Sequence, residues 1–214
     1  MPRRRYTQYH KVMSEEERKQ LLEYTLQESP SIRMSIWIMD SLGVRSCEAL
    51  ALRIQDIDFE RKIVTINATK QNKVIEMPLP KSLALRLKTH YRQFQDIIEM
   101  KEGHLCFAHG HGAKGLHIKY KTLSWFFTRF RRKYGYTKPY NIRKDGKPQF
   151  RHASHTLRSC WGTRFLKACE KKGFTAHAPK LLQQSWQHAD MKTTWKYIRL
   201  HDFETKVSSI IEEM

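Results

Sequence analysis

The stretch KIVTINATKQNKVIEMP, residues 62–78, decides the fold class of this 214-residue chain. Its two halves are rich in β-branched residues that alternate with polar ones, and this period of two is typical of strands. The polar residues 68–72 separate the two halves. The segment therefore predicts a β-hairpin, with one strand over residues 62–67 and the other over residues 73–78.

Helical patterns lie on the N-terminal side of this hairpin. The segment SEEE, residues 14–17, has the hydroxyl and the carboxylate of a capping box, and it predicts the start of a helix that ends at Pro30. One side of this helix is expected to carry Leu21, Leu22 and Leu26. A second helix is expected to stop near Gly43, and a short helix is expected over residues 47–52.

Helical periodicity returns on the C-terminal side of the hairpin. A long amphipathic helix is expected after Pro80, and residues 105–107 are expected to form a third short strand. Further amphipathic helices are expected over residues 123–133 and from about residue 157, with a basic loop over residues 136–150. The expected fold class is α+β, a mostly helical domain with a small antiparallel sheet or hairpin.

The composition indicates a polyanionic partner. Lys and Arg number 40 against 21 Asp and Glu, which gives a formal net charge of +19. Basic side chains gain affinity for nucleic acid by releasing counterions from phosphates, so DNA or RNA is the first candidate. A generic basic protein, such as a ribosomal or membrane-surface protein, is the alternative. The basic N-terminus, with Arg3, Arg4 and Arg5, is either a solvated tail or a phosphate-contacting arm.

The sequence also excludes some classes of protein. Its four cysteines form no CxxC pair, so they indicate neither a zinc knuckle nor a redox motif, and their sparseness fits a reducing compartment. No stretch approaches the roughly 20 apolar residues that a membrane span requires. The four histidines His104, His109, His111 and His117 match no standard zinc spacing.

Trp125, Trp161, Trp186 and Trp195 lie in helical patterns and are expected in the core.

Six residues along the chain have the chemistry that phosphodiester cleavage without a metal requires. They are Arg45, Lys70, His155, Arg158, His188 and Tyr197. Two guanidiniums can clamp the charged oxygens of the pentacovalent transition state. A tyrosine phenol can attack the phosphorus, a lysine can protonate the leaving oxygen, and histidines can exchange protons.

The order and spacing of these residues resemble the tyrosine recombinase family, also called phage integrases. The segments that carry the resemblance are GVRSCEALALRIQDID (43–58), TKQNK (69–73) followed by MPL (77–79), HTLR (155–158), QSWQH (184–188) and KTTWKY (192–197). The resemblance extends from about Met13 to the C-terminus. Gln187 stands where the family usually has glycine.

The resemblance implies roles for the residues that bind and attack the phosphate. Arg45 and Arg158 would bind the scissile phosphate, with Glu48 supporting Arg45. Tyr197 would be the nucleophile and would form a 3′-phosphotyrosine. His188 would hydrogen-bond to the phosphate.

The resemblance also implies the proton-transfer groups and the cofactor requirement. Lys70 would be the general acid, with Lys73 on the same hairpin as the alternative, and His155 would assist proton transfer. The phosphotyrosyl bond conserves the energy of the broken bond, so no metal, ATP or other cofactor is expected. A non-catalytic, architectural DNA-binding protein with the same fold is the competing hypothesis.

The expected partner is double-stranded DNA. The residues expected to contact it outside the catalytic set are Lys73, Arg3, Arg4, Arg5, Arg131, Arg132 and Lys144. Residues 1–12 are expected to be a basic arm, and residues 13–214 a catalytic domain without a separate core-binding domain. A cytoplasmic, nucleoid-associated location is expected.

Self-association on DNA, from a dimer to a tetrameric synapse, is expected through an amphipathic helix that begins at about residue 202. Its apolar residues are Phe203, Val207, Ile210 and Ile211.

Overall fold

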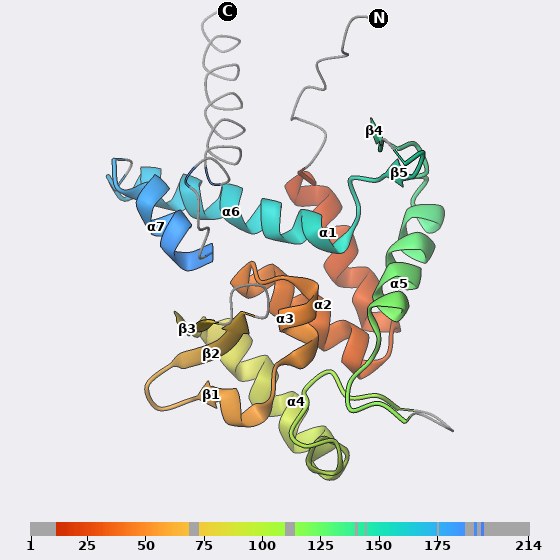
Figure 1. Cartoon of the computed structure of the whole chain (residues 1–214), viewed down its shortest axis with the longest axis vertical. Helices are drawn as coiled ribbons and strands as arrows, with labels where there is room; N and C mark the ends of the chain where they lie inside the picture. The colour runs from red at the N-terminus through yellow and green to blue at the C-terminus, as the bar shows by residue number, and fades with distance from the viewer. Residues whose placement is uncertain are drawn as a thin grey trace, which may run out of the picture.

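The computed structural model describes residues 12–68, 73–109, 114–139, 141–143, 145–174, 176–186, 191 and 194. The helices are α1 (Glu15–Tyr24), α2 (Pro30–Leu42), α3 (Ser46–Ala51), α4 (Lys81–Met100), α5 (Tyr120–Lys133), α6 (Ser154–Lys171) and α7 (Ala178–Trp186), with 3-10 turns η2 (Thr25–Gln27) and η3 (Ile54–Asp56). The strands are β1 (Ile57–Asp58), β2 (Ile63–Ala68), β3 (Lys73–Pro78), β4 (Asn141–Ile142) and β5 (Pro148–Gln149). This confirms a mostly helical fold with a small antiparallel sheet (Figure 1).

Helix α2 forms the centre of the fold and packs against α3, α4, α5 and α6. It begins with Pro30, whose missing N–H removes no intrahelical bond at this position. Most of its residues are buried, and Ile36, Ile38 and Met39 are fully inaccessible to solvent. It ends at Gly43, which has φ of 65° and donates its N–H to the Met39 carbonyl, so the predicted stop is confirmed.

The sheet has the antiparallel order β1-β2-β3. Strands β2 and β3 pair from Ile63–Pro78 to Ala68–Lys73, which confirms the predicted hairpin. Val64 and Ile66 on one face of β2 are 0% and 1% exposed, in agreement with the alternating sequence pattern. The third strand is β1, which the sequence analysis missed.

The expectation of a strand over residues 105–107 is wrong. The backbone groups of this buried segment bond to two different parts of the chain, because Leu105 donates to the Leu52 carbonyl and the Cys106 carbonyl accepts from Ile118. Isolated bridges, Arg53–His104 and Phe107–His117, form in place of a ladder. The segment is apolar because it crosses the core.

The predicted capping box at the start of α1 is confirmed, since Ser14 Oγ accepts from the Glu17 N–H and the Glu17 carboxylate accepts from the Ser14 N–H. Leu21 is fully buried, but Leu26 is 57% exposed. The α-helix ends at Tyr24 and continues as a tighter 3-10 turn, which removes Leu26 from the apolar side. Trp125 is also exposed, which corrects its expected place in the core.

Helices α6 and α7 share a second, smaller apolar cluster. Its buried members are Leu166, Cys169, Ala178, Leu182 and Trp186, with Trp161 and Phe165 packed against them. In Figure 1 these two helices lie across the top of the molecule, above α2 and α3. Within the described ranges, every helix is too short or too polar to traverse a lipid bilayer.

Candidate functional site

Arg45 lies where the chain turns from α2 into α3. It precedes the first residue of α3, and Glu48 is the third residue of that helix. Glu48 Oε2 accepts a 2.7 Å hydrogen bond from the Arg45 backbone N–H, and Oε1 accepts one of 2.7 Å from Arg45 Nη1. A carboxylate at this position satisfies a backbone donor at the helix start, and the positive end of the helix dipole stabilises its negative charge. Glu48 thereby fixes both the main chain and the side chain of Arg45.

Arg158 approaches the same carboxylate from α6. Its Nη1 donates to the Gly43 carbonyl at 3.0 Å and lies 3.9 Å from Glu48 Oε2. Its Nη2 donates to the Trp186 carbonyl at 3.1 Å, and its guanidinium lies 4.8 Å from the centre of the Trp186 ring. Arg158 therefore joins the end of α2, the start of α3 and the end of α7.

The three charged side chains Arg45, Glu48 and Arg158 form what we call the arginine cluster. The side chains of Glu48 and Arg158 are 2% and 4% exposed, whereas that of Arg45 is 27% exposed. Two guanidiniums face one carboxylate, so the cluster carries a net positive charge and favours an anion at its open side, where Arg45 reaches the surface. His155 lies one helical turn before Arg158 on α6 and is exposed.

Two tryptophans fix the helices of the arginine cluster. Trp161 Nε1 donates to the Ser41 carbonyl at 2.9 Å, and a Cβ at Gly43 would lie 2.6 Å from the Trp161 ring. A Cβ at Gly162 would overlap the ring of Trp186. Sequence reasoning placed both tryptophans in the core but missed this role, because each glycine meets a tryptophan that no local pattern connects to it.

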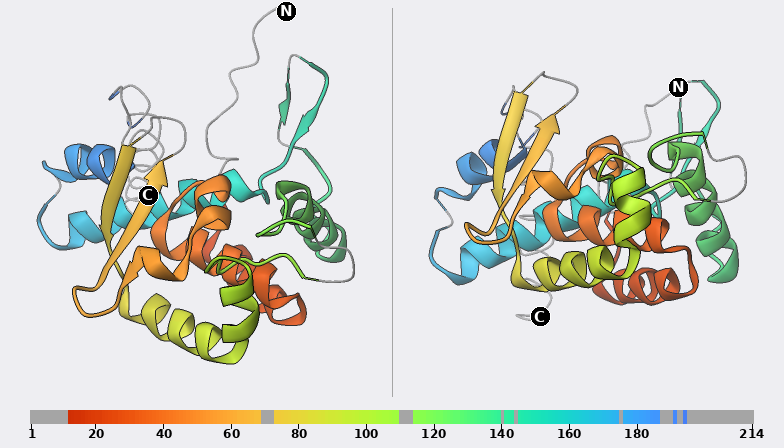
Figure 2. Two further views of the ribbon diagram at one scale, coloured as in Figure 1. Left: turned by 60° about the horizontal axis from the view of Figure 1, so that its bottom comes forward. Right: turned by 90° about the horizontal axis from the view of Figure 1, so that it is seen from below.

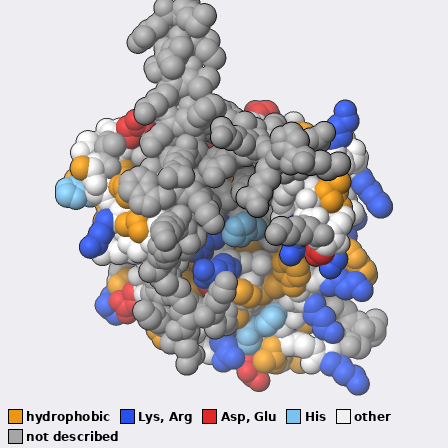
Figure 3. Space-filling model, turned by 45° about the horizontal axis from the view of Figure 1, so that its top comes forward, with side chains coloured by type: hydrophobic (Ala, Val, Ile, Leu, Met, Phe, Trp, Pro, Cys, Tyr) orange, Lys and Arg blue, Asp and Glu red, His pale blue; other side chains and the backbone are white. Residues whose placement is uncertain are grey.

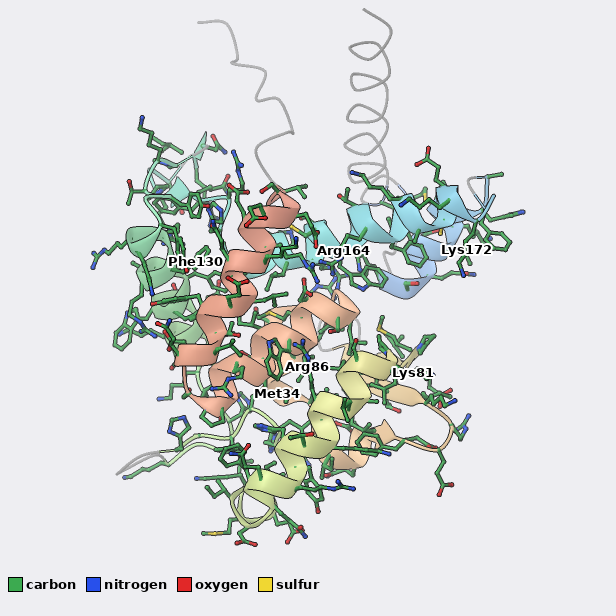
Figure 4. All side chains as sticks on the ribbon, turned by 180° about the vertical axis from the view of Figure 1, so that it is seen from behind. Met34, Lys81, Arg86, Phe130, Arg164 and Lys172 are labelled. Carbon is green, nitrogen blue, oxygen red and sulfur yellow. The ribbon has the colours of Figure 1, made fainter. Side chains whose placement is uncertain are left out.

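Asp40 ties α6 to α1 and α2, and sequence reasoning missed it as well. Arg18 donates to both carboxylate oxygens at 2.7 and 2.6 Å, and Arg164 donates to Oδ1 at 2.9 Å and to the Asp40 carbonyl at 2.6 Å. Burial alone would raise the pKa of Asp40, but the hydrogen bonds and charges of Arg18 and Arg164 hold that pKa below its ordinary value. Figure 4 shows Arg164 where α6 passes these helices.

The structure brings together Arg45, Glu48 and Arg158 from the predicted site, and His155 lies three residues before Arg158 on α6. The other predicted positions Lys70, His188, Tyr197, Arg3, Arg4, Arg5 and Lys144 lie outside the described residues. Lys73 begins β3, and its side chain is outside the description.

The two predicted DNA contacts on α5 differ in their surroundings. Arg131 is half-buried, donates to the His152 carbonyl at 2.8 Å and covers the ring of Phe150. Burial, together with the charge of Arg132, lowers the pKa of Arg131. Arg132 is exposed. Arg131 therefore has a structural contact in addition to the DNA contact expected of it.

Basic side chains are prominent on the face drawn in Figure 3, where Lys and Arg lie around the edge and again near the centre beside His side chains. Among the residues that the structure describes, no three His, Cys, Asp or Glu side chains gather as a metal site. The ring centres of His104 and His117 lie 5.3 Å apart.

Comparison with known proteins places this geometry in context. The model of the phage integrase family matches residues 11–204. The tyrosine recombinase XerA of Pyrococcus furiosus is 26% identical over 190 residues, which are 89% of this chain and 57% of that protein. The chain thus spans little more than half the length of the curated relative it matches.

Two solved structures share the fold. A crystal structure of XerA recombinase superposes with a TM-score of 0.68 at 19% identity, covering 100% of this chain and 68% of the other. A post-cleavage complex of the XerH site-specific recombinase, bound to palindromic difH substrate, superposes with a TM-score of 0.65 at 20% identity, covering 96% of this chain and 54% of the other.

Proposed function

The chain belongs to the phage integrase family, and from this premise we propose that it is a site-specific DNA recombinase that cuts and rejoins DNA through a covalent bond to Tyr197. The observation that carries the proposal is the arginine cluster, in which buried Glu48 holds Arg45 and Arg158 together. Two guanidiniums so placed suit the non-bridging oxygens of one phosphate. The similarity to XerH, a site-specific recombinase whose solved complex holds its palindromic difH substrate, supports DNA as the partner.

In the proposed reaction, Tyr197 Oη attacks the scissile phosphorus while the bond from phosphorus to the 5′ oxygen breaks. Arg45 and Arg158 neutralise the charge that develops on the non-bridging oxygens, and His188 adds a hydrogen bond to them. The result is a 3′-phosphotyrosine and a free 5′ hydroxyl. Attack by a 5′ hydroxyl on the phosphotyrosine reverses the step and rejoins the DNA.

Two protons move in the cleavage step. His155 assists removal of the phenol proton of Tyr197, and Lys70 supplies a proton to the departing 5′ oxygen. The phosphotyrosyl bond retains the energy of the broken phosphodiester, so the proposed reaction requires no ATP. It requires no metal ion because Arg45 and Arg158 neutralise the phosphate oxygens and Lys70 protonates the leaving oxygen.

The test is trapping of the covalent intermediate. A duplex selected from a randomised library by binding to the protein would carry a nick just to the 3′ side of the cleavage position, so that the short fragment with the free 5′ hydroxyl diffuses away and cannot rejoin. The protein would be incubated with this duplex in EDTA and analysed on a denaturing gel. We expect an adduct with wild type and with Tyr120→Phe, which alters an exposed tyrosine at the start of α5, and none with Tyr197→Phe.

The same gel separates the competing function. Tight binding of the selected duplex without an adduct from wild type would refute the recombinase and favour the architectural DNA-binding protein. An adduct that persists in Tyr197→Phe would show that the nucleophile is misassigned.

The role of Lys70 has its own test. A 5′-bridging phosphorothiolate substrate releases a thiolate, which needs no protonation by the enzyme. Lys70→Ala is expected to cleave the ordinary substrate at least about 100-fold more slowly than wild type, and to approach the wild-type rate on the phosphorothiolate. An equal defect on both substrates would contradict the assignment.

We further propose that the residues after Leu200 mediate assembly of the recombinase on DNA. A chain ending at Leu200 is expected to bind single sites but to form fewer paired-site complexes in gel-shift assays. Unchanged synapsis and recombination by the truncated chain would count against this.

A further inference from the structure

The structure contains a second hairpin, β4–β5, which has no role in the proposed cleavage reaction. Asn141 pairs with Gln149 and Ile142 with Pro148. The turn is closed by a 2.9 Å hydrogen bond from the Arg143 N–H to the Lys147 carbonyl. The sequence predicted only a basic loop here.

This hairpin projects to the same side of the molecule as the β2–β3 hairpin. Both views in Figure 2 show the two hairpins pointing in one direction, with α3 and α6 between them and α4 on the opposite side. The arginine cluster lies on α3 and α6. A duplex bound at the arginine cluster would therefore have the β2–β3 hairpin on one side of the cluster and the β4–β5 hairpin on the other.

The base of the β4–β5 hairpin is anchored to the core. The rings of Tyr136 and His152, which flank the hairpin, stack with centres 3.9 Å apart. Arg131 of α5 donates to the His152 carbonyl, and Arg151 lies 3.2 Å from Glu17 of α1. An anchored hairpin loses less conformational freedom when it binds a partner than a free loop would.

The exposed side chains of the hairpin suit DNA. Those of Arg143 and Lys147 are 58% and 75% exposed, and Ile142 beside them is 62% exposed. Asp145 lies within 3.6 and 3.7 Å of the two basic groups and neutralises part of their charge. Such exposed ion pairs contribute little energy, so phosphates can readily compete with Asp145 for these cations.

Resting on the proposed function, we propose that the β4–β5 hairpin is a second DNA-binding element that enters the major groove beside the scissile phosphate. Arg143 and Lys147 contact phosphates, and Ile142 faces the base edges. The major groove, about 12 Å wide, admits a two-stranded ribbon, whereas the minor groove is about half as wide.

The salt dependence of binding tests the phosphate contacts. The variant Arg143→Gln/Lys147→Gln would be compared with Lys88→Gln/Arg92→Gln, which removes equal charge from exposed positions on α4. Each phosphate contact contributes about 0.9 to the slope of log K against log salt concentration, so the hairpin variant is expected to lower that slope by about 1.8. The α4 variant is expected to leave the slope unchanged. A slope that is unaffected in the hairpin variant, or equally affected in both variants, would overturn the proposal.

Methylation of guanine N7 by dimethyl sulfate tests the groove, because N7 lies in the major groove. A third variant would have residues 141–149 replaced by a short Gly-Ser turn. Wild type and the α4 variant are expected to protect guanines beside the cleavage position from methylation. The shortened variant is expected to leave the same guanines reactive. Identical protection by all three proteins would overturn the proposal. Matching melting temperatures would show that the shortened variant is folded.

The adduct assay separates this proposal from the proposed function. At saturating protein, the hairpin variants should still form the Tyr197 adduct. If wild type forms no adduct but the difference in salt slope remains, the recombinase is refuted and the DNA-binding hairpin stands. If the adduct forms and the slopes agree, the hairpin proposal alone fails.

Discussion

At the scale of single residues, Glu48 holds a 2% exposed carboxylate between the guanidiniums of Arg45 and Arg158. Glu48→Gln keeps the size of the side chain but removes the negative charge that the two arginines share. We expect the free energy of unfolding to fall by about 3 kcal/mol, because buried charge is left uncompensated. Urea unfolding at neutral pH measures this loss.

Glu76→Gln is the matched control. The Glu76 side chain is 58% exposed and lies 4.0 Å from Arg61. Its loss is expected to change stability by less than about 1 kcal/mol, as is usual for surface pairs. Equal losses in the two variants would contradict the role given to Glu48.

Gly162→Ala provides a prediction of sign. In an unobstructed helix this substitution stabilises by about 1 kcal/mol, because alanine is the better helix former. At position 162 the new Cβ would overlap the Trp186 ring, so we expect a loss of about 1–3 kcal/mol from overpacking. Thermal unfolding decides between the two signs.

The double variant Gly162→Ala/Trp186→Phe identifies the cause of that loss. The smaller ring leaves room for the new methyl group, so the double variant is expected to lose less stability than the two single losses added together. Strictly additive losses would mean that the overlap with Trp186 is not the cause.

At the scale of secondary-structure elements, Asp40 links α1, α2 and α6, and its effect depends on pH. The folded protein lowers the pKa of Asp40 from 3.8, so the carboxylate stabilises the fold above that pH and the stabilisation disappears as the pH falls through the lowered pKa. We expect Asp40→Asn to be less stable than wild type at pH 7. The difference should shrink at pH values below 3.8, as measured by urea unfolding.

His152, at the base of the β4–β5 hairpin, acts in a different pH window. Burial lowers its pKa from 6.5 to about 4, with the charges of Arg151 and Arg131 acting in the same direction and that of Glu17 opposing them. The unfolded chain then takes up the proton first, so wild type should lose stability as the pH falls from 6.5 towards 4. His152→Phe should lose less over this range, and parallel curves for the two proteins would contradict the prediction.

The elements also show what a sequence pattern can predict. The β2–β3 hairpin and the stop at Gly43 were predictable, because β-branched alternation and a left-handed glycine are local signals. Strands β1, β4 and β5 have two residues each, too few to show a period. The prediction of a strand over residues 105–107 failed because a buried segment is equally apolar whether or not it pairs with another strand.

The candidate site divides in the same way. Arg45 and Glu48 are three residues apart, so their contact could be expected from a capping-box spacing. The contacts of Arg158 with Gly43 and Trp186, and of Asp40 with Arg164, join positions far apart in sequence. Contacts of this kind follow from the packing of α6 and leave no local pattern.

At the scale of the whole molecule, the net charge of +19 should dominate DNA affinity. A protein that makes 6–10 phosphate contacts loses roughly 10³–10⁵ in affinity between 50 and 200 mM salt. We expect a loss in that range, measured by fluorescence anisotropy with a labelled duplex. A change below about tenfold would mean that few of the basic residues meet phosphates.

The anchorage of Arg158 has a consequence for how this protein should be dissected. Two of its hydrogen bonds end on the main-chain oxygens of Gly43 and Trp186, which every substitution at those positions retains. Alanine at Gly43 or Trp186 therefore leaves both acceptors in place, and alanine at Arg158 removes both contacts together. Replacing the amide after either residue by an ester, through semisynthesis, would weaken the carbonyl as an acceptor without altering any side chain. The acceptors of these two hydrogen bonds belong to the backbone, so their contribution is measured separately from that of the side chains only by changing the backbone itself.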